Sequence, residues 1–227
     1  MARRTKEEAL ETRHKLLDSA EHLFQAQGVS RTSLQDIARH AGTSRGAIYW
    51  HFKDKANLFN AMMERVTLPM EASFSHEESD LEGASGANAH ALSRIRHATI
   101  NALQQIVNDA QTRRVFEVAT QKVEYVEELQ AVRLRHLAVR QGFLSRVELS
   151  MNAASHQTKL TLAMPAATAA QGLHALIDGL IQNWLLDPQA FNLLEVGQCV
   201  MNVYLRGLGF ASELDPTIKA GRIPPSA

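Results

Sequence analysis

The amino-acid sequence predicts an all-α protein of about nine helices. Apolar residues recur at intervals of three and four positions along most of the chain, which is the period of an amphipathic helix. Alternating runs of Val, Ile and Thr bounded by turn residues, which would indicate strands, are almost absent. Gly28, Gly42, Pro165 and Pro188 lie between the periodic segments, where such residues start or stop helices.

Three helices are expected in the first 53 residues. A long helix carries one apolar stripe that includes Leu16 and Phe24, and it ends at Gly28. A short helix begins after Ser33, the expected N-cap, and ends at Gly42. The segment SRGAIYWHF, residues 44–52, forms the third.

A larger helical region is expected to follow from residue 54. The polar, glycine-containing segment 75–88 is predicted to be a loop, and 155–164 is expected to connect two helices. The remaining helices are expected at 54–75, 89–108, 111–123, 125–152, 166–186 and 190–208.

The composition limits the classes of protein to consider. No stretch approaches the roughly 20 consecutive apolar residues that span a membrane, and the charged N-terminus is unlike a secretory signal. Cys199 is the single cysteine, which excludes an intramolecular disulfide and a multi-cysteine metal site. We therefore expect a cytoplasmic protein with no membrane partner, bound metal or cofactor.

Charge is unevenly distributed along the chain. The formal net charge is zero, yet residues 1–55 hold 10 Lys and Arg against 7 Asp and Glu, and four of the ten histidines. Chance fluctuation is one explanation of so modest an excess. A phosphate-binding surface is the other, because such a surface needs local positive charge whatever the net charge of the protein.

Residues 33–52 have the pattern of a helix-turn-helix. Two short helices are separated by a few residues that include Gly42, which can adopt the positive φ of a tight turn. Ile37 and Ala38 would face the partner helix, and the small Ala38 lets the two backbones approach. Ile48 would anchor the second helix to the core. A long amphipathic helix precedes the pair, as expected for a three-helix DNA-binding unit.

The segment TSLQDIARHAGTSRGAIYWHFKDKANLF closely resembles the DNA-binding segment of the TetR family of bacterial repressors. RRTKEEALETR near the start, TRRVFEV at 112–118 and DGLIQNWLLDP at 178–188 resemble the AcrR and TtgR branch, which represses multidrug efflux operons. The resemblance implies a helix-turn-helix DNA-binding domain over residues 1–53 and a larger ligand-binding and dimerisation domain over 54–227.

The second short helix is the expected recognition helix for double-stranded operator DNA. Arg45 can offer a bidentate pair of donors to guanine, and Gly46 and Ala47 lack the bulk that would keep the backbone out of the major groove. Tyr49 and His51 can donate to phosphates.

Other residues around this helix have two possible roles. Lys55 is expected to add positive charge beside the DNA backbone, whereas Phe52 is expected in the core. The hydroxyls of Ser33, Thr43 and Ser44 suit either helix capping or phosphate contact. Trp50 is left open between core packing and contact with the DNA backbone.

A ligand site is expected around helix 166–186. His174, Asp178 and Gln182 are spaced at i, i+4 and i+8 and so share one face of an apolar helix. A polar edge at an interface is the alternative explanation of this carboxylate. In the resemblance the matching aspartate lines a drug pocket, and Phe116, Thr120 and Gln121 come from a pocket-lining helix.

The last two helices are apolar on more than one face and need a partner. A four-helix interface between two copies of the chain would bury these faces, as the resemblance also implies. The residues expected in this homodimer interface are Leu180, Trp184, Val200 and Tyr204.

These observations predict a ligand-responsive transcriptional repressor of a multidrug efflux operon, released from DNA by a small hydrophobic or cationic effector. A repressor of a catabolic or lipid operon that answers a metabolite or acyl compound is the alternative. An all-helical enzyme is a remote one, because the sequence has no nucleophile elbow, paired metal-ligand spacing or glycine-rich phosphate loop. No catalytic residues are expected. A helical adaptor would leave residues 45–55 unexplained.

Overall fold

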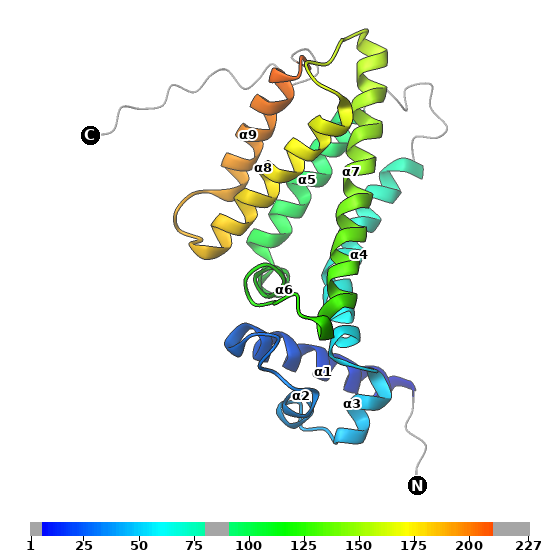
Figure 1. Cartoon of the computed structure of the whole chain (residues 1–227), viewed down its shortest axis with the longest axis vertical. Helices are drawn as coiled ribbons and strands as arrows, with labels where there is room; N and C mark the ends of the chain where they lie inside the picture. Colours follow the sequence, from blue (N-terminus) through cyan, green and yellow to red (C-terminus); the bar gives the residue numbers. More distant parts are fainter. Residues whose placement is uncertain (1–5, 80–90, 211–227) are drawn as a thin grey trace, which may run out of the picture.

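The computed structural model describes residues 6–79 and 91–210, and these residues are helical throughout their regular structure (Figure 1). The predicted all-α fold class is confirmed. The α-helices are α1 (Lys6–Gln27), α2 (Leu34–His40), α3 (Arg45–His51), α4 (Lys55–Ser79), α5 (Ala91–Asn108), α6 (Ala110–Gln121), α7 (Gln130–Thr158), α8 (Ala166–Leu186) and α9 (Leu193–Gly207), and a 3-10 turn covers Glu127–Leu129. None of the described helices has the length and apolar character needed to cross a membrane.

The caps of the short helices follow the sequence signals. The Ser33 hydroxyl accepts from the Asp36 N–H at 3.1 Å, and the Asp36 carboxylate accepts from the Ser33 N–H at 3.2 Å, so α2 begins with a capping box. Ser44 caps α3 with its hydroxyl alone, which accepts from the Ala47 N–H at 3.2 Å. Gly28 and Gly42 have positive φ, as the ends of α1 and α2 require.

Two boundaries differ from the prediction. Helix α4 continues to Ser79, so the loop expected over 75–88 is wrong for residues 75–79, and residues 80–88 lie outside the described part. Glutamate has a high helix propensity, which is compatible with continuation of the helix through Glu77 and Glu78. Helix α7 begins at Gln130 and runs to Thr158, so residues 155–158 are helical and do not belong to a connection. It ends where Lys159 takes the left-handed conformation, with φ of 51°.

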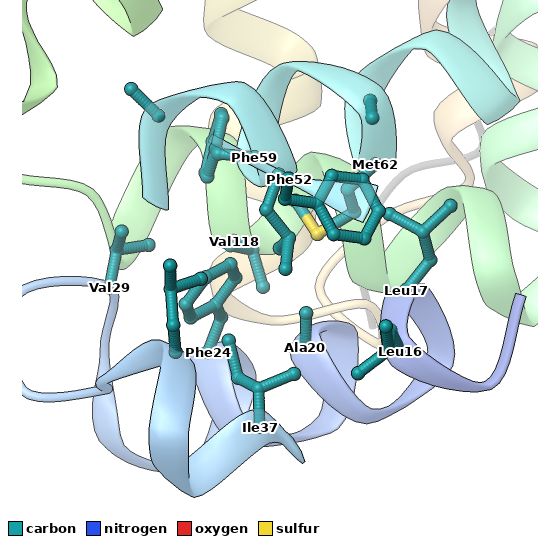
Figure 2. Packing of buried hydrophobic residues seen from close by; sticks show 14 of the residues in the cluster. Leu16, Leu17, Ala20, Phe24, Val29, Ile37, Phe52, Phe59, Met62 and Val118 are labelled. Carbon is teal, nitrogen blue, oxygen red and sulfur yellow. The ribbon is translucent and has the colours of Figure 1, made fainter. Parts of the chain in front are cut away.

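The first hydrophobic core joins the N-terminal helices to α4, α6 and the start of α7. Phe24 of α1 and Phe59 of α4 lie with their ring centroids 6.1 Å apart. Figure 2 shows Val118 of α6 and Phe52 directed into the same cluster. The helix-turn-helix therefore shares its core with helices of the larger domain.

The second core lies among α5, α7, α8 and α9. Figure 1 shows this bundle at one end of the molecule and α1, α2 and α3 at the other, with α6 between them and α4 and α7 running alongside. Phe116 of α6 packs against both cores.

Candidate functional site

Helix α3 separates buried anchors from an exposed polar and aromatic face. Ile48 is fully buried and Phe52 is 1% exposed, which confirms their predicted place in the core. Tyr49 is 49% exposed and Trp50 is 73% exposed, so Trp50 does not pack in the core of the protomer. Two adjacent aromatic rings on the surface of a seven-residue helix form a surface suited to a partner.

The residues before and within this face are arranged around Arg45. Its guanidinium lies 5.7 Å from the centre of the Tyr49 ring, which holds the charge on the exposed side of α3. Gly46 and Ser44 are exposed beside it, and Ala47 is half-buried. The hydroxyl of Ser44 is engaged in capping.

The remaining predicted contacts surround this group. Ser33 is exposed and caps α2, whereas the Thr43 hydroxyl is half-buried and donates to the Ala38 carbonyl at 3.4 Å. His51 is half-buried, with its ring 4.5 Å from the Trp50 ring in an edge-on arrangement. Of the ten predicted DNA-contact residues, Ser44, Arg45, Gly46, Tyr49 and Trp50 are thus exposed on α3 and its N-cap, and their contact with DNA stays a prediction.

Lys55 requires a correction. Its side chain is only 8% exposed, and its ammonium lies 3.3 Å from the Glu128 carboxylate and 3.4 Å from the Ser30 carbonyl oxygen to which it donates. A buried, paired ammonium in this conformation is not available to a phosphate. Lys55 instead ties the start of α4 to the segment before α7.

A mostly apolar cavity of about 260 Å³ lies in the larger domain between α4, α5, α6, α7 and α8. Its described lining consists of Phe59, Asn60, Met63, Thr67, Thr99, Ala102, Leu103, Phe116, Ala119, Thr120, Tyr125, Val132, Arg135, His136, Val139, Arg140, Phe143, Arg146, His174, Ile177, Asp178 and Ile181. An apolar cavity with a few polar groups is the usual form of a small-molecule site.

Four of the six predicted ligand-binding residues line this cavity, namely Phe116, Thr120, His174 and Asp178. The prediction is wrong for the two glutamines. Gln121 is exposed at the end of α6, outside the lining. Gln182 is also exposed, and its amide donates to the Asp178 carboxylate at 2.5 Å, so it supports the lining aspartate from outside.

The polar groups near Asp178 have perturbed acidity. Burial lowers the pKa of His174 below its ordinary value, and Arg140 and His136 lower it further, while the charge of Asp178 opposes them. Burial and then the Asp178 charge raise the pKa of Tyr125. Both shifts favour the uncharged forms of the His174 imidazole and the Tyr125 phenol.

The sequence did not predict the contribution of α7 to the cavity. Arg135, His136, Arg140, Phe143 and Arg146 all line the cavity, and they lie on one stripe of this helix. Polar and apolar residues are mixed on every side of α7. The periodicity of the sequence alone therefore does not single out this stripe, although the basic residues at helical spacing around Phe143 were a usable signal.

Helix α6 connects the cavity to the DNA-binding helices. Its Phe116 and Thr120 face the cavity, while Glu117 accepts from the Gln25 amide of α1 at 2.7 Å. After α6, the Lys122 carbonyl accepts from the Val29 N–H at 3.0 Å. A bound molecule that displaced α6 would therefore also displace α1 and the turn that follows it.

A buried carboxylate lies at the centre of this connection. Glu21 of α1 is 1% exposed and accepts from the Gln111 amide of α6 at 3.0 Å. Its carboxylate is also 3.3 Å from Arg65 of α4 and 3.4 Å from Arg114 of α6. Burial raises the pKa of Glu21, and Arg65 opposes this.

Comparison with known proteins places these features in a family. Residues 16–62 match the family model described as bacterial regulatory proteins, tetR family. Residues 90–210, more than half of the chain, match the model for the C-terminal region of MAATS-type transcriptional repressors. The chain belongs to the TetR family. Its members are DNA-binding transcriptional regulators, so the enzyme alternative is set aside.

Several relatives align with most of this chain. The transcriptional regulator TtgR of Pseudomonas putida is 36% identical over 86% of this chain and 90% of its own length. The regulator AcrR of Shigella flexneri is 37% identical over 85% and 87%. The crystal structure of native NalD from Pseudomonas aeruginosa has a TM-score of 0.78 at 36% identity, covering 88% of this chain and 96% of its own.

TetR repressors bind operator DNA and form dimers, so the α8 and α9 surface is the expected contact between protomers. Trp184 requires a correction, because it is only 5% exposed and its ring lies 5.2 Å from the Arg113 guanidinium of its own protomer. Tyr204 is half-buried and donates to the Ala169 carbonyl at 2.9 Å. Leu180 and Val200 are half-buried.

The large apolar residues of α8 and α9 that are exposed were not among the predicted interface residues. Val203 is 63% exposed, Leu186 is 72% exposed and Leu176 is 37% exposed. The apolar character of both helices predicted an interface, but it did not show which side of each helix the protomer itself covers.

Proposed function

We propose that this chain represses a multidrug efflux operon and leaves its operator when a small hydrophobic effector fills the cavity. NalD, which shares the fold and 36% of the sequence, is described as the secondary repressor of the MexAB-OprM multidrug efflux pump in Pseudomonas aeruginosa. The observation that carries the proposal is the position of α6, which forms part of the cavity wall and also holds α1.

Operator recognition is assigned to the exposed face of α3 and its surroundings. Arg45, Gly46 and Ala47 enter the major groove, with Arg45 directed at a guanine. Tyr49, Trp50 and His51 contact the DNA backbone. The hydroxyls of Ser33, Thr43 and Ser44 belong to the same proposed face, and Lys55 does not.

Release follows from the contacts of α6. A homodimer places its two recognition helices about 34–36 Å apart, one turn of DNA. An effector against Phe116 and Thr120 favours a position of α6 that displaces α1 through the contacts of Glu117, Gln111 and Lys122. Nearly complete release requires the effector to bind the released form about 10⁴-fold more tightly than the DNA-bound form.

The test is a binding experiment with the intact dimer. Fluorescently labelled DNA from upstream of its own gene is titrated with protein by anisotropy, and aromatic drug-like compounds and a long-chain acyl compound are then added separately. Release by drug-like compounds supports the proposal. Release by the acyl compound alone would favour the lipid-operon alternative, and failure to bind the DNA specifically would refute operator recognition there.

A further inference from the structure

The segment between α6 and α7, residues 123–129, is tied near both of its ends to the turn after α1. Near its start, the Glu124 carboxylate accepts from the Ser30 hydroxyl at 3.2 Å. Near its end, the Glu128 carboxylate lies 3.3 Å from the Lys55 ammonium, which donates to the Ser30 carbonyl at 3.4 Å. One segment therefore holds Ser30 from two directions.

Packing at the end of this segment adds to the polar contacts. Leu129 is fully buried in the core that also contains Phe24 of α1 and Ile48 of α3. The Asn60 amide of α4 donates to the Ala131 carbonyl at the start of α7 at 3.5 Å, and Figure 1 shows the starts of these two helices side by side. A displacement of the end of the segment therefore disturbs the packing around the DNA-binding helices.

Tyr125 lies between these two anchors and lines the cavity. Its ring centroid is 6.3 Å from that of His136 on α7, which also lines the cavity. Tyr125 is 51% exposed, so its ring lies where the cavity meets the surface. Because Tyr125 is half exposed and lies outside the helices, a bound molecule can displace it without opening a packed core.

The connectivity of the chain passes such a displacement to the turn after α1. Consecutive Cα atoms are about 3.8 Å apart, and Tyr125 is adjacent to Glu124. The Val126 N–H donates to the Glu124 carbonyl at 2.9 Å, which closes a tight turn around Tyr125. A shift of Tyr125 by a bound ring is therefore passed to Glu124, and from Glu124 to Ser30.

The contacts of residues 123–129 are separate from those of α6. Helix α6 reaches α1 through Glu117, which accepts from the Gln25 amide. Its C-cap residue, Lys122, accepts from the Val29 N–H. The two sets of contacts use different side chains, so each can be removed alone.

We propose that residues 123–129 form a second link between the cavity and the recognition helices, in which Tyr125 contacts the effector and its displacement reaches the turn after α1 through Glu124. Glu124 and Ser30 are positioning residues in this link, because they act through Tyr125. This inference rests on the proposed function, because it describes how effector binding is transmitted to the operator-binding helices.

The test measures the coupling between cavity and operator with N-phenyl-1-naphthylamine, a neutral aromatic dye. Coupling is the ratio of the operator dissociation constants of the full-length dimer with and without saturating dye. Ser30→Ala and Glu124→Ala each remove one surface hydrogen bond and should lower this ratio about two- to thirtyfold. The double variant should lose no more than either single one, because both remove the same bond. The affinity for dye without DNA should stay within about twofold.

Tyr125→Ala tests the cavity end of the link. Removal of the ring should lower the coupling at least as much as Ser30→Ala does, whereas Tyr125→Phe keeps the ring and should retain the coupling. Ser145→Ala is the matched control, because Ser145 is exposed on α7 outside the cavity lining and its hydroxyl accepts from the Gln141 amide at 3.4 Å. Thermal melting identifies any variant that is not folded, and the surface variants then carry the test.

The outcomes separate this inference from the proposed function. Unchanged coupling in Ser30→Ala and Glu124→Ala overturns the inference, as does an equal loss in Ser145→Ala. If Gln25→Ala lowers the coupling in that case, α6 alone transmits effector binding and the proposed function still stands. If the dye does not bind, or binds without changing the operator affinity of the wild type, both proposals fail.

Discussion

The DNA-binding helices and the effector domain use aromatic residues in opposite ways. Around α1, α2 and α3 the interior is filled by Phe24, Phe52 and Phe59, and the rings of Tyr49 and Trp50, which we propose contact DNA, lie outside. In the larger domain Phe116 and Phe143 border an interior space. A surface that reads DNA needs a rigid support, whereas a site for small molecules needs room inside.

The largest expected effect tests the separation of buried from exposed aromatic residues in α3 and its C-cap residue, Phe52. Phe52→Ala should lower the free energy of unfolding by about 3–5 kcal/mol, because a buried ring is replaced by a cavity. Trp50→Ala should leave it within about 0.5 kcal/mol, because the ring is mostly exposed, yet weaken operator binding. Chemical denaturation and DNA titration measure the two. Comparable destabilisation by both changes would contradict the division.

The second largest effect is expected at Glu21, through which α1 contacts α4 and α6. Glu21→Ala leaves Arg65 and Arg114 without their shared carboxylate and should cost about 3 kcal/mol in the free energy of unfolding. Glu21→Gln is the matched isosteric variant. Denaturation of both, with operator titration of each folded variant, shows whether this contact supports the DNA-binding helices. A loss below about 0.5 kcal/mol for Glu21→Ala would show that it does not.

The same carboxylate gives a dependence on pH with a defined sign. The pKa of Glu21 is raised above its ordinary 4.5 in the folded chain, so the folded state holds the proton more tightly than the unfolded state. Its contribution to stability is therefore full below pH 4.5 and is lost as the pH rises through the raised pKa. We expect the difference in unfolding free energy between wild type and Glu21→Gln to change in this direction, and a constant difference would refute it.

Operator recognition should show a smaller change in free energy. Arg45→Ala should weaken specific operator binding by about 1–3 kcal/mol, the range for one bidentate base contact. The dimer should remain intact in sedimentation, because Arg45 is exposed. Arg133→Ala, on α7, is the control of equal charge. Loss of the dimer, or equal weakening on unrelated DNA, would argue against base recognition by Arg45.

The smallest effect is expected at Lys55. If its ammonium stays paired with Glu128 and bonded to the Ser30 carbonyl, Lys55→Gln should change operator affinity by less than about twofold. The slope of log affinity against log salt should then be unchanged. A slope reduced by about one would mean that Lys55 contacts a phosphate after all and that the buried pair opens on DNA.

The sequence predicted the local features of the fold well. Capping signals at Ser33 and the glycines after α1 and α2 operate over a few residues, and the helix-turn-helix is a local pattern. The failures involve distant partners. Lys55 pairs with Glu128, 73 positions away, and Trp184 contacts Arg113, 71 positions away. Arg140 became a cavity residue only through the rotation of α7 against α8, which no local pattern determines.

Phe116 links the two cores and the cavity through a single side chain. A substitution that reshapes the cavity there also changes the support of the recognition helices. If the proposed function holds, a substitution of Phe116 is expected to change effector binding and operator binding together. Arg140 and Phe143 border the cavity without belonging to the core that holds the recognition helices, so substitutions there are expected to change the cavity alone.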